Sequence, residues 1–155
     1  MTMDIRTVGV VGAGQMGNGI AHVCALAGLD VRINDISEDK LNQALATING
    51  NLARQVSKGA ISEEERRATL DRIVPVRTYE GLAECDLVIE AATENEEIKR
   101  KILVELCPQV RPDAILSTNT SSISITRLAA ATDRPERFIG IHFMNPVPVM
   151  QLVEL

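Results

Sequence analysis

The sequence has little of what would suggest a disulfide-linked, metal-binding or polyanion-binding protein. Its three cysteines, Cys24, Cys85 and Cys107, are odd in number and widely spaced, and there are only two histidines. This pattern argues against a disulfide framework and against a zinc site. A net charge of −5 and a pI near 5.1 argue against duplex nucleic acid or an anionic membrane as a partner, because both are bound through basic patches. We therefore expect a reduced, cytoplasmic protein that contacts neither.

Long apolar runs, internal repeats and low-complexity tracts are also absent. The N-terminal run VGVVGAG is too short to span a membrane, and it lacks the regions of a signal peptide. With 155 residues, of which 45% are hydrophobic, the chain is long enough to build one substantial core. We therefore expect one domain over residues 1–155.

Short apolar runs alternate with stretches of helical spacing. Most of the runs lack polar alternation, which favours strands covered by helices on both faces. The expected strands are residues 7–12, 30–35, 71–76, 86–92, 114–119 and 137–143. Crossover helices are expected over residues 95–107 and over residues 122–132, the second capped by Ser121 or Ser122. This alternation predicts an α/β fold with a doubly wound, mainly parallel sheet.

Two further helices are expected between the second and third strands. Ser37 is placed to cap the first of them, and Gly59 to end it. Its apolar stripe comprises Leu41, Leu45, Ile48, Leu52 and Val56. Ser62 and Glu65 have capping-box spacing, which predicts the start of a second, short helix. The sequence therefore predicts a helical hairpin inserted after the second strand.

A glycine-rich turn, GAGQMG, joins the first strand to the helix that follows it. Gly12 would make the tight turn, Gly14 would let backbone approach a pyrophosphate, and Gly17 would let helix and strand pack closely. Gln15 and Met16, within the same turn, are counted with the glycines as candidate cofactor-binding residues, and the N-terminus of the following helix would face the negative charge of a dinucleotide. Alone this motif is a weak signal, but here it lies directly between a buried strand and a helix.

Asp35 strengthens the prediction of a dinucleotide site. It ends the second strand about twenty residues after the turn, where a carboxylate accepts hydrogen bonds from ribose hydroxyls and repels a 2′-phosphate. This favours NAD over NADP, while FAD and other adenosine ligands stay open on these residues alone.

A candidate catalytic pair lies in the closing stretch IGIHFMNPVPVMQLVEL. His142 falls at the end of the sixth expected strand, at the carboxyl edge where open α/β sheets bind ligands. The run STNTSS ends the fifth strand at the same edge and supplies hydroxyl and amide groups. Glu154 adds a carboxylate to an otherwise apolar strand, where it could orient His142 and stabilise the imidazolium. A lone strand histidine is more often structural, so the hypothesis depends on these neighbours.

Four motifs together closely resemble the NAD-binding domain of the (S)-3-hydroxyacyl-CoA dehydrogenases, most of all the bacterial branch that acts on 3-hydroxybutyryl-CoA. They are GAGQMG, LVIEAATEN, STNTSSISIT and HFMNPVPVMQLVEL. The resemblance covers essentially the whole chain in order, and the last two motifs are far more specific than the glycine turn. It implies a Rossmann-type fold, NAD as the cofactor, and hydride transfer between 3-hydroxyacyl-CoA and 3-oxoacyl-CoA.

The resemblance also implies roles for single residues near the chemistry. By it, His142 is the general acid/base and Glu154 its partner. Ser121 and Asn145 match ligands of the substrate oxygen and of the nicotinamide region.

Further roles implied by the resemblance concern the two coenzymes. Glu94 and Lys99 match positions that hold the nicotinamide ribose. Asn51 and Lys58 match contacts to coenzyme A, and Arg54 stands where relatives also carry a basic residue. These last three share one exposed face of the first hairpin helix, a face otherwise interpreted as ordinary solvated surface.

The family has a second, mostly helical domain, which closes over the substrate, supplies a catalytic asparagine and carries the interface of a homodimer. The resemblance therefore implies that residues 1–155 are the NAD-binding domain and that the second domain is absent from this chain. One alternative is an NAD-binding module without turnover, either crystallin-like or an isolated fragment. Another is a 3-hydroxyacid dehydrogenase, a class with a similar glycine turn that relies on a later lysine and fits NTSS and HFMNP poorly.

Overall fold

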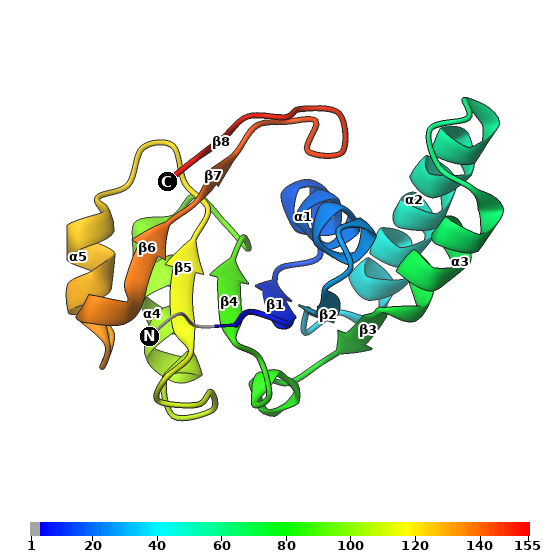
Figure 1. Ribbon diagram of the computed structural model, residues 1–155. Coiled ribbons are helices and arrows are strands. Elements are labelled where there is room, and N and C mark those ends of the chain that lie inside the picture. The colour runs from blue at the N-terminus through cyan, green and yellow to red at the C-terminus, as the bar shows by residue number, and fades with distance from the viewer. Residues whose placement is uncertain (1–3) are drawn as a thin grey trace.

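The computed structural model describes residues 4–155. Its centre is a six-stranded sheet with the order β3-β2-β1-β4-β5-β6, in which every pairing is parallel (Figure 1). The strands are β1 (Thr7–Val11), β2 (Asp30–Asn34), β3 (Ile73–Val76), β4 (Leu87–Glu90), β5 (Ile115–Thr118) and β6 (Phe138–Gly140). The chain winds outward from β1 in one direction and from β4 in the other, so the carboxyl ends of β1 and β4 form a switch point. The predicted doubly wound parallel sheet is confirmed.

Helices cover both faces of this sheet (Figure 1). They are α1 (Gln15–Leu26), α2 (Glu38–Ser57) and α3 (Glu63–Asp71) on one side, and α4 (Glu96–Leu106) and α5 (Ile125–Ala130) on the other, with short 3₁₀ turns η1 (Tyr79–Leu82) and η2 (Pro135–Arg137). Each face has its own buried core, with Ile20 and Ile48 in one and Leu103 and Leu128 in the other. Burial of each such side chain contributes about 1.5–3 kcal/mol, which holds the helices against the strands.

The helical hairpin predicted after the second strand is confirmed. α2 begins at Ser37, whose hydroxyl accepts a hydrogen bond from the Lys40 N–H at 3.3 Å. α3 begins at a complete capping box, in which the Ser62 hydroxyl accepts from the Glu65 N–H at 3.1 Å and the Glu65 carboxylate accepts from the Ser62 N–H at 3.2 Å. Gly59, between the helices, has a φ of 76°, which lets the chain reverse after α2.

The start of α5 differs from the prediction. Its cap is Ser124, and neither Ser121 nor Ser122 caps it. The Thr120 hydroxyl accepts hydrogen bonds from the N–H groups of Ser122 at 3.3 Å and Ile123 at 3.2 Å, which holds these residues in a turn. The helix therefore begins only at residue 125, because the local side-chain bond competes with helix formation.

The last predicted strand is interrupted at Ile141, so His142 lies beyond β6 and outside the six-stranded sheet. It belongs to β7 (His142–Phe143), which pairs antiparallel with β8 (Val153–Glu154). Figure 1 shows this hairpin above the carboxyl edge of the sheet, with its loop next to α1. Val147 in that loop is buried in the core on the α1 side, which anchors the hairpin to the domain.

Candidate active site

The glycine turn lies at the carboxyl edge, between β1 and α1. Gly12 has a φ of 103°, a left-handed conformation that side chains rarely adopt. A Cβ atom on Gly17 would lie 1.7 Å from the Gly12 carbonyl oxygen, so this approach of helix to turn requires glycine. Gly14 is the N-cap of α1, and a Cβ atom placed there would meet nothing within 4 Å. The open space at a helix N-terminus without a side-chain cap fits a pyrophosphate.

Asp35 has a structural role that the sequence did not predict. Its carboxylate accepts hydrogen bonds from the Ala13 N–H at 3.0 Å and from the Ser37 N–H at 2.9 Å. It therefore ties the glycine turn to the start of α2. A carboxylate has about four acceptor positions, so capacity remains for ribose hydroxyls.

A cavity of about 240 Å³ continues from the turn toward the ends of β4 and β5. Its lining is Gly14, Gln15, Met16, Ala91, Ala92, Thr93, Glu94 and Asn119. It thus brings together four of the predicted cofactor residues. The Glu94 carboxylate is held there by the Thr120 hydroxyl, which donates to it at 2.9 Å. Asn119 was not named among the cofactor residues, although it supplies the amide that the STNTSS run was expected to bring to this edge.

Lys99 lies beneath this cavity and outside its lining. The side chain is fully buried, and its ammonium donates to the Glu90 carboxylate at 2.6 Å, to the Thr118 hydroxyl at 3.1 Å and to the Asn119 carbonyl at 3.1 Å. These bonds use all three N–H donors of the ammonium. In this structure Lys99 supports the ends of β4 and β5, while its predicted contact with the nicotinamide ribose stays a prediction.

His142 and Glu154 face each other directly in the register of β7 and β8. The His142 Nδ1 lies 3.2 Å from a carboxylate oxygen of Glu154. A carboxylate only accepts hydrogen bonds, so Nδ1 carries the proton and Nε2 of the neutral ring is left free to accept one. The adjacent Phe143 N–H donates to the Asn119 side chain at 3.0 Å, which ties the histidine strand to the end of β5.

The remaining two predicted residues lie at the same edge. The Gln15 side chain donates to the Asn145 carboxamide oxygen at 3.4 Å, which links the glycine turn to the loop after β7. Ser121 is exposed in the loop after β5. The parallel sheet therefore gathers residues from four distant segments, because its strand ends meet at one edge.

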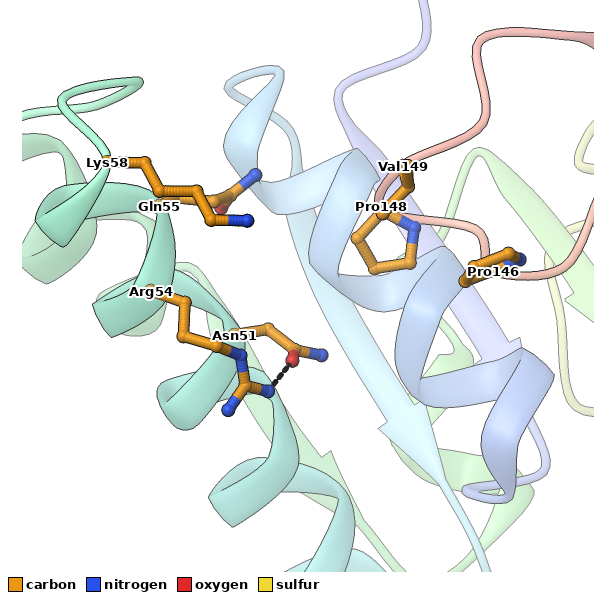
Figure 2. A pocket seen from close by; sticks show the side chains of 7 residues that line it. All are labelled: Asn51, Arg54, Gln55, Lys58, Pro146, Pro148 and Val149. Atoms are coloured by element: carbon orange, nitrogen blue, oxygen red, sulfur yellow. Dashed lines mark hydrogen bonds between the residues drawn. The ribbon is translucent and has the colours of Figure 1, made fainter.

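A second pocket, of about 170 Å³, lies between α2 and the loop after β7 (Figure 2). Its lining is Asn51, Arg54, Gln55, Lys58, Pro146, Pro148 and Val149. The three residues predicted to share one face of α2 therefore do line one site, opposite the proline-rich loop (Figure 2). Gln55 was not predicted, but its position one helical turn after Asn51 is the signal that could have identified it.

The three cysteines take no part in either site. All are free thiols, and burial raises the pKa of Cys24 to about 11 and that of Cys85 to about 12.

Within residues 4–155 no helix is long and apolar enough to cross a membrane. That same part of the chain holds no group of three or more His, Cys, Asp or Glu side chains suited to a metal ion.

Comparison with known proteins gives consistent matches. The chain is 66% identical over 155 residues to a 3-hydroxybutyryl-CoA dehydrogenase of Bradyrhizobium diazoefficiens, covering all of this chain and 53% of that protein. It is 45% identical to the 3-hydroxyadipyl-CoA dehydrogenase of Escherichia coli, again over its full length but over 33% of that protein. The crystal structure of a Ralstonia eutropha (S)-3-hydroxybutyryl-CoA dehydrogenase matches 97% of this chain and 53% of its own, with a TM-score of 0.95 and 51% identity.

The chain thus spans about half of the length of two of these relatives and a third of the other. Residues 7–155 match the family model described as "3-hydroxyacyl-CoA dehydrogenase, NAD binding domain". This match, over nearly the whole chain and in agreement with the glycine turn and Asp35, shows that the chain belongs to the NAD-binding domains of the 3-hydroxyacyl-CoA dehydrogenases and that its cofactor is NAD.

Proposed function

We propose that this chain is the NAD-binding and acid-base part of an oxidoreductase that interconverts 3-hydroxyacyl-CoA and 3-oxoacyl-CoA, with 3-hydroxybutyryl-CoA as its substrate. The observation that carries the proposal is the His142–Glu154 pair at the same sheet edge as the glycine turn. The relatives from Bradyrhizobium and Ralstonia are 3-hydroxybutyryl-CoA dehydrogenases, which supports the choice of substrate.

In this proposal His142 moves the proton of the substrate hydroxyl. Bound NAD supplies a hydride acceptor at C4 of its nicotinamide ring. In oxidation the Nε2 atom of His142 accepts the hydroxyl proton while the hydrogen on C3 leaves as hydride, and in reduction a protonated His142 returns that proton. Glu154 holds Nδ1, which orients the ring and stabilises the imidazolium. Such a base contributes about 10²–10⁴ in rate.

Other residues of the proposal bind and orient. Asp35 would accept from the adenosine ribose, and Glu94 from the nicotinamide ribose. Ser121 and Asn145 would bind the substrate oxygen and the nicotinamide region, and Lys99 would support the strand ends below them. Their support is their common position along the carboxyl edge.

The coenzyme A part of the substrate would occupy the pocket between α2 and the proline-rich loop. Arg54 and Lys58 bring two positive charges to it, and Asn51 adds a carboxamide. Coenzyme A carries several phosphate groups, and cations attract them through a salt-dependent interaction.

A second, mostly helical domain is part of this proposal, together with a homodimer formed through it. Its support is that the chain spans 53% of the Bradyrhizobium relative. We also propose that the protein acts in the cytoplasm, which agrees with the unpaired thiols of Cys24, Cys85 and Cys107.

The proposal is tested by comparing residues 1–155 with a protein of the relatives' full length. NAD binding is measured by calorimetry, and oxidation of (S)-3-hydroxybutyryl-CoA by the absorbance of NADH. We expect both proteins to bind NAD and only the longer one to turn over rapidly, because an open site loses orientation and electrostatic strength. Rapid turnover by residues 1–155 alone would contradict the need for a second domain. NAD binding without turnover in the longer protein would favour a binding module instead.

A further inference from the structure

The pocket between α2 and the loop after β7 presents hydrogen-bond donors to a ligand. Arg54 and Lys58 can only donate. The carboxamide oxygen of Asn51 accepts a hydrogen bond from Arg54, and that of Gln55 faces the His22 Nε2 atom at 3.0 Å. Each carboxamide oxygen therefore already accepts a hydrogen bond within the protein, and neither NH₂ group has a partner among the described residues.

The opposite wall of the pocket consists of Pro146, Pro148 and Val149, which have no polar side-chain atoms. The Pro146 carbonyl accepts hydrogen bonds from the N–H groups of Val149 at 3.1 Å and Met150 at 3.0 Å. Proline has no N–H group, so Pro146 and Pro148 contribute mainly apolar surface. The polar side chains that line the pocket therefore all come from α2 and its C-cap residue Lys58 (Figure 2).

His22 determines which end of the Gln55 carboxamide faces inward. It lies in α1, is fully buried, and has no partner for its Nδ1 atom within residues 4–155. Because a carboxamide oxygen only accepts, the His22 Nε2 atom must carry the ring proton. In the reverse orientation the carboxamide NH₂ group would donate to Nε2, so the neutral ring would carry its proton on Nδ1. That buried N–H would have no partner within residues 4–155, and buried donors without a partner are rare. Burial lowers the pKa of His22, which agrees with a neutral ring that donates through Nε2.

We infer that His22 is a positioning residue that fixes the Gln55 carboxamide with its NH₂ group toward the pocket, where it donates to an acceptor oxygen of the ligand. This inference rests on the proposed function, in which the pocket takes coenzyme A. Coenzyme A offers two kinds of acceptor next to Arg54 and Lys58, its phosphate oxygens and the amide carbonyls of its pantetheine arm. Gln55 thereby becomes a specificity residue that favours acceptor-rich ligands over ligands with donor groups.

The binding test measures the affinity of the 155-residue chain for coenzyme A by calorimetry. Gln55→Met keeps the side-chain length but removes the NH₂ group, and is expected to weaken binding about three- to tenfold, as for one neutral hydrogen bond. Gln43→Met is the matched control, because Gln43 is exposed on the same helix and is not part of the pocket lining. Adenosine 3′,5′-bisphosphate is the second probe. A loss on both probes assigns the acceptor to the nucleotide part, and a loss on coenzyme A alone assigns it to the pantetheine arm.

The positioning role has its own test. His22→Leu releases the carboxamide and is expected to weaken coenzyme A binding, whereas His22→Gln supplies an N–H donor to Gln55 and should restore most of the affinity. Equal affinities for the two variants would contradict the role of His22. Nitrogen NMR of the unmodified chain should show His22 protonated at Nε2 and unprotonated at Nδ1. A proton at Nδ1 would overturn the inference even if His22→Leu fails to fold.

Failure of the inference can be told apart from failure of the proposed function. The double variant Arg54→Gln/Lys58→Gln removes both charges from the pocket and should weaken coenzyme A binding most at low salt. If this variant loses affinity while Gln55→Met does not, the inference is wrong and the proposed coenzyme A site stands. If neither variant loses affinity, both are wrong.

Discussion

Replacing Lys99 with methionine should destabilise the domain strongly, because it leaves the Glu90 carboxylate charged and buried without a cation. Both side chains are 0% exposed, and their charged atoms lie 2.6 Å apart. Methionine fills most of the space of the lysine stem but offers no donor to Glu90 or to the Thr118 and Asn119 oxygens.

The size of the effect follows from what remains around Glu90. After the substitution its carboxylate still accepts from the Thr118 hydroxyl at 2.6 Å and from the Ala92 N–H at 2.8 Å. These bonds solvate the charge in part but do not neutralise it. Breaking a buried ion pair by removing one partner costs about 3–5 kcal/mol, so we expect a loss of that size in the free energy of unfolding. For a domain of this length the melting temperature should fall by about 6–20 °C.

Urea unfolding of three chains provides the measurement: the unmodified chain, Lys99→Met, and Lys99→Met/Glu90→Gln. The double variant removes the uncompensated charge and should recover much of the stability, since a neutral pair of similar volume costs far less to bury. A loss below about 1 kcal/mol in the single variant would show that water or a rearranged neighbour compensates the charge. A double variant as unstable as the single one would refute the electrostatic explanation. If Lys99 instead contacts a ribose directly, the folded single variant should lose NAD affinity as well.

Three further predictions follow from the two sites. Asp35→Ala should weaken NAD binding in calorimetry and relax discrimination against NADP, because the ribose loses its acceptor and the repulsive charge disappears; an unchanged preference would contradict the assignment. In a protein of the relatives' full length, His142→Ala or Glu154→Gln should lower turnover by about 10²–10⁴ and leave NAD affinity nearly unchanged, and unchanged turnover in either variant would exclude the proposed pair. Burial holds the pKa of His22 below its ordinary value of 6.5, so the unfolded chain binds more protons just below that pH. The free energy of unfolding should therefore fall as the pH drops below about 6.5, by at most about 1.4 kcal/mol per pH unit, and His22→Gln should flatten this dependence in urea titrations.

Features that depend on neighbouring residues could be predicted from local sequence patterns. Ser37 and the Ser62–Glu65 box start helices because their bonds span three residues, and the glycine turn is a property of six consecutive positions. Alternating strands and helices then allow few topologies, so the parallel sheet was predictable. The start of α5 was not, because several adjacent hydroxyls compete for the same N–H groups and Thr120 takes two of them.

Contacts between side chains that are distant in the sequence could not be predicted in this way. The His22–Gln55 bond joins residues 33 positions apart on different helices, and nothing in their spacing indicates it. The burial of Lys99 against Glu90 depends on how α4 packs over the strand ends, so its support of those ends could not be predicted from local patterns, and its contact with a ribose stays a prediction. The His142–Glu154 distance likewise follows from the register of a hairpin that leaves the main sheet at Ile141. Helix packing and strand register depend on the whole core, and local patterns carry no information about them.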